Sequence, residues 1–151
     1  MYMETKSFNI ELGVGVGLFK FGMSREALRQ KAGEPDEIEK NDDELDDEGH
    51  IEVWHYDDYD LSVEFIEGND WHLSTIAVNS ENCFLGDVCL IGKNMSEVTS
   101  FIEATKLGEY EMEKLDLDDH HEVVLVSVFD AGLNLWFEAG VLTEIQLAPT
   151  D

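Results

Sequence analysis

Positive charge is scarce in this sequence. Its 151 residues include 9 Lys and Arg against 35 Asp and Glu, which gives a formal net charge of −26. A field of this sign repels the phosphates of nucleic acids and the headgroups of anionic lipids. We therefore expect no nucleic acid and no membrane among its partners, whereas a basic protein surface would be attracted.

Cysteines and long apolar runs are also few. Cys83 and Cys89 are the only two cysteines, and their apolar neighbours are typical of small buried side chains rather than of a disulfide or a zinc site. No segment approaches the length that spans a bilayer. The first ten residues carry Glu4 and Lys6 and lack the apolar run of a signal peptide, so the sequence predicts a cytoplasmic protein.

The residues that are present are sufficient for an ordinary core. Hydrophobic residues make up 43% of the chain and aromatic residues 10%, and a chain of this length buries roughly 70% of its unfolded surface. Disorder is therefore excluded on composition. The acidic surface either attracts a partner or only keeps the protein soluble, and composition does not decide between the two.

The first half of the chain predicts one helix followed by three strands. Ser24 can cap a helix over residues 25–32, and Gly33 and Pro35 end it. Nine of the thirteen residues in 36–48 are acidic, which favours an exposed loop. Runs of β-branched and aromatic residues separated by turn residues then predict an antiparallel meander, over 51–56, 61–66 and 73–78.

The second half has the same order of elements. A helical pattern over 96–106 precedes an acid-rich segment, and three predicted strands follow, over 123–129, 133–137 and 141–147. Met95 and Ser96 then correspond to Met23 and Ser24. The sequence thus predicts one α+β domain of two repeats, about 8–80 and 84–149, with helices packed on one face of a shared sheet. An unrepeated α+β domain is the alternative.

Several short motifs follow one another in the order of a known unit. They are Gly22, Met23 and Ser24 before the first helix, Gly33 and Pro35 after it, and Trp54, His55 and Tyr56 at the start of the meander. This pattern resembles the small outer-membrane assembly lipoproteins of the SmpA/OmlA type and, in tandem, the β-lactamase inhibitory protein. The resemblance implies a continuous sheet whose open concave face docks a globular protein. An acidic inhibitor of this size also resembles bacterial immunity proteins, which neutralise a toxin.

Strand alternation assigns side chains to the two faces of the predicted sheet. We expect six apolar side chains under the helices: Trp54, Tyr56, Val63, Phe65, Leu135 and Phe137. The other face would then carry His55, Ser62, Glu64, Asn134 and Trp136. An exposed tryptophan on a sheet is a natural anchor for a partner, although a register shifted by one residue would bury Trp136 instead.

The acidic loop completes the predicted partner-binding site. This site comprises Asp42, Asp43, Glu44, Asp46, Asp47, Glu48, His55, Glu64 and Trp136. The loop residues could steer the chain toward a basic cleft and occupy it. The alternative is a loop that is acidic only because it is solvated.

No catalytic, cofactor or metal motif stands out. His120 and His121 are adjacent and would point to opposite faces of a strand, and the acidic runs lack the spacing of a calcium loop. We therefore predict a non-enzymatic inhibitor, such as an immunity protein, that blocks the active site of a basic toxin or enzyme. A non-catalytic scaffold or regulatory module is the alternative, and a deep pocket around a perturbed carboxylate would instead favour an enzyme.

Overall fold

The protein is built from two β-sheets and two short α-helices. The computed structural model describes residues 8–41, 50–81, 83–86, 88–118 and 121–149. The elements, in chain order, are β1 (Phe8–Glu11), β2 (Gly15–Val16), β3 (Phe19–Lys20), α1 (Arg25–Ala32), β4 (Glu37–Asn41), β5 (Ile51–Tyr56), η1 (Asp57–Tyr59), β6 (Leu61–Ile66), η2 (Glu67–Asn69), β7 (His72–Val78), β8 (Cys83–Phe84), α2 (Met95–Thr105), β9 (Glu111–Asp118), β10 (His121–Val128), η3 (Phe129–Ala131), β11 (Leu133–Glu138) and β12 (Val141–Leu147).

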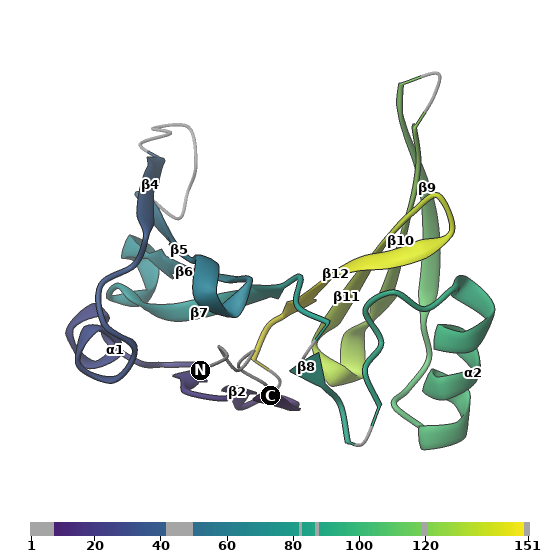
Figure 1. Ribbon diagram of the computed structural model, residues 1–151, viewed down its shortest axis with the longest axis horizontal. Coiled ribbons are helices and arrows are strands. Elements are labelled where there is room, and N and C mark those ends of the chain that lie inside the picture. Colours follow the sequence, from purple (N-terminus) through teal and green to yellow (C-terminus); the bar gives the residue numbers. More distant parts are fainter. Residues whose placement is uncertain (1–7, 42–49, 82, 87, 119–120, 150–151) are drawn as a thin grey trace, which may run out of the picture.

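The large sheet has eight strands in the order β4-β5-β6-β7-β12-β11-β10-β9. All its pairings are antiparallel, and the two halves join where β12 pairs with β7. The ends of the sheet rise at β4 and at the β9–β10 hairpin, so one face lies on the inside of the curve (Figure 1). We call this the open face, and the opposite one the core face.

A small sheet covers the core face under the middle of the large one (Figure 1). Its strand order is β3-β2-β1-β8, and β1 and β8 pair in parallel although they are far apart in the sequence. This small sheet contributes the buried side chains of Ile10, Val16, Phe19 and Cys83 to the core. Gly15 permits its close strand contact, because a Cβ there would lie 2.0 Å from the carbonyl oxygen of Phe19.

The two α-helices lie at the two ends of the same side (Figure 1). Ser24 caps α1 by accepting a hydrogen bond from the amide of Ala27, and Asn94 forms a capping box with Glu97 at the start of α2. Each helix buries only a narrow stripe, comprising Leu28 in α1, and Val98 and Ile102 in α2. Neither helix is long and apolar enough to cross a membrane.

The predicted α+β fold class is wrong. The molecule is mainly β: two sheets contain twelve strands of the described residues, and only two α-helices accompany them. Much of the difference comes from two acidic segments that were not predicted as strands. Residues 37–41 and 111–118 instead form β4 and β9, the two edge strands of the large sheet. An edge strand tolerates this charge because one of its sides faces solvent, and charge there prevents pairing with other chains.

Candidate functional site

Side chains along the strands of the large sheet alternate between the open face and the core. Trp54, Val63 and Phe65 are fully buried, whereas their neighbours His55, Ser62 and Glu64 are half-buried on the other side. On β11 the buried Leu135 and Phe137 likewise flank the half-buried Trp136. The open-face residues Val53, Leu125 and Trp136 are outside the main hydrophobic core. The predicted division of these side chains between two faces is therefore confirmed.

The two cationic residues of the large sheet lie on one side of it, whereas carboxylates lie on both. Strand register places seven carboxylates on the open face: Glu37, Glu39, Glu64, Glu111, Glu113, Glu138 and Glu144. The large sheet contains only two cationic residues, Lys40 and Lys114. Lys40 is in register with Glu52, and Lys114 forms an ion pair with Glu122, so both lie on the core-face side. Within the described strands, the open face thus carries no Lys or Arg.

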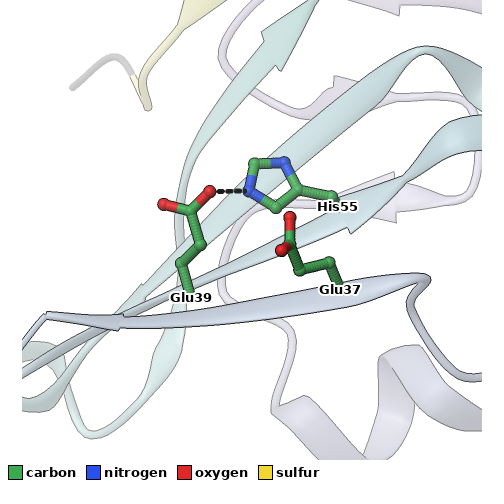
Figure 2. Close-up of side chains that lie close together, drawn as sticks. All are labelled: Glu37, Glu39 and His55. Atoms are coloured by element: carbon green, nitrogen blue, oxygen red, sulfur yellow. Dashed lines mark hydrogen bonds and ion pairs between the residues drawn. The ribbon is translucent and has the colours of Figure 1, made fainter.

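A Glu–Glu–His cluster lies near the β4 edge of the open face. Figure 2 shows the carboxylates of Glu37 and Glu39 directed toward the imidazole of His55. His55 Nε2 lies 2.8 Å from Glu39 Oε1, and its Nδ1 lies 2.7 Å from Ser62 Oγ. A neutral imidazole has one donor and one acceptor nitrogen, so the Ser62 hydroxyl donates to Nδ1 when Nε2–H donates to Glu39. The ring is thereby fixed across β4, β5 and β6.

This cluster also has the ligand types that could hold a divalent cation. One atom from each of Glu37, Glu39 and His55 lies within 4.8 Å of the others. Such an ion would replace the proton shared by His55 and Glu39, while Ser62 would hold the ring from the opposite nitrogen. The prediction of no metal site relied on histidine spacing along the chain. It overlooked Glu37 and Glu39 because their segment was predicted to be a loop.

A cavity of about 270 Å³ opens on the other half of the open face. It is lined by Asn79, Val123, Trp136, Glu138, Thr143 and Glu144. Apolar walls come from the indole and from Val123, which is buried but lies outside the main core. The rim carries two carboxylates. This cavity combines an aromatic surface with negative charge, which suits a cationic side chain better than an anionic one.

A β-bulge positions Trp136 in this cavity. The register between β11 and β12 shifts between Trp136 and Phe137, which leaves Thr143 as the extra residue. The Thr143 hydroxyl donates to the carbonyl oxygen of Trp136 at 3.3 Å. A bulge twists its strand and redirects the adjacent side chains. The indole Nε1 is buried and has no hydrogen-bond partner among the described residues.

The predicted site residues have different outcomes. His55, Glu64 and Trp136 all lie on the open face, as expected from alternation. The acidic loop residues lie outside the described residues, so their part of the prediction stays untested; they are Asp42, Asp43, Glu44, Asp46, Asp47 and Glu48. The sequence prediction missed the acids of the edge strands and those of β11 and β12. Only strand pairing brings these acids onto the same face.

Two buried acidic groups lie away from the open face. Burial raises the pKa of the Cys83 thiol to about 12. Burial and the nearby Glu34 carboxylate raise the pKa of Tyr56 to about 12, and its hydroxyl donates to the carbonyl oxygen of Gly33. Both groups are therefore neutral at physiological pH. Neither is suited to act as a nucleophile or base there.

Comparisons with known proteins give one structural likeness. No family model and no curated protein matches the chain. The 1.5 Å crystal structure of an extracellular protein containing an SCP domain, from Bacillus anthracis strain Ames, is similar with a TM-score of 0.46 and 17% sequence identity. The similarity covers 85% of this chain and 44% of that one. This chain therefore spans less than half of the matched structure.

These findings correct two further predictions. The resemblance to the SmpA/OmlA-type lipoproteins and the β-lactamase inhibitory protein is wrong, because no family model matches and the molecule is mainly β rather than a tandem of helix-plus-sheet units. The predicted cytoplasmic location is withdrawn, because its basis, the lack of an apolar leader, does not establish where the protein resides.

Proposed function

We propose that this protein binds a basic protein partner on its open face and inhibits it by covering its cationic surface. The observation that carries the proposal is the absence of Lys and Arg from the open face within the described strands. Seven carboxylates lie on the open face and both cationic residues of the sheet lie on the other side. A solubilising surface needs net charge but does not need cations to be absent from one face.

The shape of the face supports the same proposal. The ends of the large sheet rise on both sides of it, which gives a partner a concave surface (Figure 1). Half-buried apolar side chains, including Leu125 and Trp136, lie among the acids. Interfaces combine such apolar anchors with complementary charge at their edges. The partner would be a toxin or enzyme whose active site is basic.

The test compares two variants of equal charge. The open-face variant carries Glu37→Gln, Glu64→Gln and Glu113→Gln. The control variant carries Glu26→Gln, Glu81→Gln and Glu109→Gln, which remove the same charge from exposed positions in α1, after β7 and before β9. Both are immobilised beside the wild type and exposed to extracts of cells that carry the gene.

We expect wild type and control to retain the same basic protein and the open-face variant to lose it. With the purified partner, the open-face variant should associate about tenfold more slowly at low salt, with a weaker salt dependence. The partner's own activity should fall when wild type is added. The proposal is wrong if both variants bind equally, and salt-independent binding would favour a scaffold or regulatory module instead.

A further inference from the structure

We infer that the cavity beside Trp136 receives an arginine side chain of the protein partner, with the guanidinium against the indole ring and within reach of the rim carboxylates. This inference rests on the proposed function and identifies the group that is bound. It depends on the chemistry of one cavity rather than on the charge of the whole face.

The rim of the cavity supplies two negative charges. Glu138 is exposed at the end of β11, and Glu144 lies opposite Trp136 on β12. Asn79 Nδ2 and Gln146 Nε2 donate to the Glu144 carboxylate at 3.4 and 3.0 Å. Both donors are neutral amides, so they hold the carboxylate in place without cancelling its charge. An ionised carboxylate has further lone pairs for an incoming donor.

The wall of the cavity favours a guanidinium over an ammonium. The guanidinium is planar, stacks on aromatic faces and presents several donors at once, whereas the lysine ammonium is compact and strongly hydrated. The same chemistry already occurs on the core-face side. There, the guanidinium of Arg29 lies 4.6 Å from the ring centroid of Trp54, and that of Arg25 lies 4.4 Å from the ring centroid of Trp71. The indole of Trp136 is the tryptophan ring of the open face.

The cavity favours an arginine within a peptide chain over the free amino acid. An arginine inside a chain carries only the positive charge of its guanidinium, because its α-amino and α-carboxyl groups are in peptide bonds. The α-carboxylate of free arginine would be repelled by Glu138 and Glu144 at the rim.

The experiment follows the three indole N–H resonances of the folded protein by NMR. Trp136→Phe assigns one of them by its loss. The ligands are acetyl-arginine methylamide, its neutral citrulline isostere, the lysine equivalent and free L-arginine. We expect a saturable shift of the Trp136 resonance with the arginine amide in the millimolar range. The citrulline, lysine and free-arginine ligands should bind at least fivefold more weakly.

Two variants test the carboxylates. Glu138→Gln with Glu144→Gln should weaken binding of the arginine amide by tenfold or more and leave the other two indole resonances in place, which reports an intact fold. The charge-matched variant Glu26→Gln with Glu109→Gln should bind like wild type. The inference is overturned if the Trp136 resonance does not shift, or if arginine and citrulline ligands bind equally well.

The outcomes separate this inference from the proposed function. If the open-face variant loses the partner but Glu138→Gln with Glu144→Gln retains it, the open face binds a basic protein and the arginine site is wrong. If the arginine amide binds at Trp136 but no basic partner depends on the open face, the site is real and the proposed function is wrong.

Discussion

Trp54 and Trp136 lie on opposite faces of the same sheet, and among the described residues only Trp54 has a partner for its indole N–H. Trp54 is fully buried in the core and donates to Glu52 Oε1 at 3.0 Å. Trp136 is half-buried on the open face, and its Nε1 has no partner among the described residues. Trp54 therefore stabilises the fold through a hydrogen bond that Trp136 lacks within the described structure.

The same substitution should accordingly have different costs at these two positions. Trp54→Phe loses a hydrogen bond to a charged group and leaves space in the core, so we expect the free energy of unfolding to fall by about 2 to 4 kcal/mol. Trp136→Phe removes a donor that makes no hydrogen bond, so it should change the free energy of unfolding by less than about 1 kcal/mol. Urea unfolding of both variants measures the difference. Equal losses would contradict the assignment of the two faces.

Glu52 is expected to be the most important acid for stability on the core-face side. Its carboxylate accepts from Trp54 Nε1 and from Arg25 at 3.0 Å, and its side chain is only 14% exposed. Glu52→Gln should lower the free energy of unfolding by about 1 to 3 kcal/mol. The control is Glu34→Gln, whose exposed ion pair with Arg29 is worth at most about 1 kcal/mol. A smaller loss for Glu52 than for Glu34 would contradict this role.

Gly15 should tolerate no side chain. An added Cβ would lie 2.0 Å from the Phe19 carbonyl oxygen and 2.8 Å from Lys20 Cα, both of them backbone atoms. Gly15→Ala should therefore separate β2 from β3 and cost at least about 2 kcal/mol by urea unfolding. Gly86→Ala is the control, because its Cβ would meet nothing within 4 Å. Gly86→Ala should lower the free energy of unfolding only by the strain of a left-handed backbone at that position, about 1 to 2 kcal/mol.

Stability should fall in alkaline solution because of Cys83 and Tyr56. Their pKa values are raised to about 12 in the fold, from ordinary values of 9.0 and 10.0. The unfolded chain therefore loses these protons first, and the stabilisation present below about pH 9 is lost as the pH rises toward 12. Urea unfolding from about pH 8 to about pH 11 measures this fall. Cys83→Ala should reduce the slope, because it removes one of the two groups whose pKa is raised.

The candidate site was only partly predictable, for a physical reason. Alternation along a single strand is local, so it correctly placed His55, Glu64 and Trp136 on one face. Glu37 and Glu144 join them only through pairing with other strands. Glu37 and Glu144 were missed for different reasons. Glu144 lies in a predicted strand, but Glu37 lies in an acidic run whose charge concealed the alternation of Glu37, Ile38 and Glu39.

The sequence by itself determined the local elements. Capping by Ser24 and the stop at Gly33 set the bounds of α1, and apolar alternation set those of β5 and β6, because these signals depend on neighbouring residues. Tertiary structure decided the rest. It paired acidic segments as edge strands, formed a second sheet from β1 and β8, and gathered seven carboxylates on one face. Those features depend on long-range register, which local patterns do not encode.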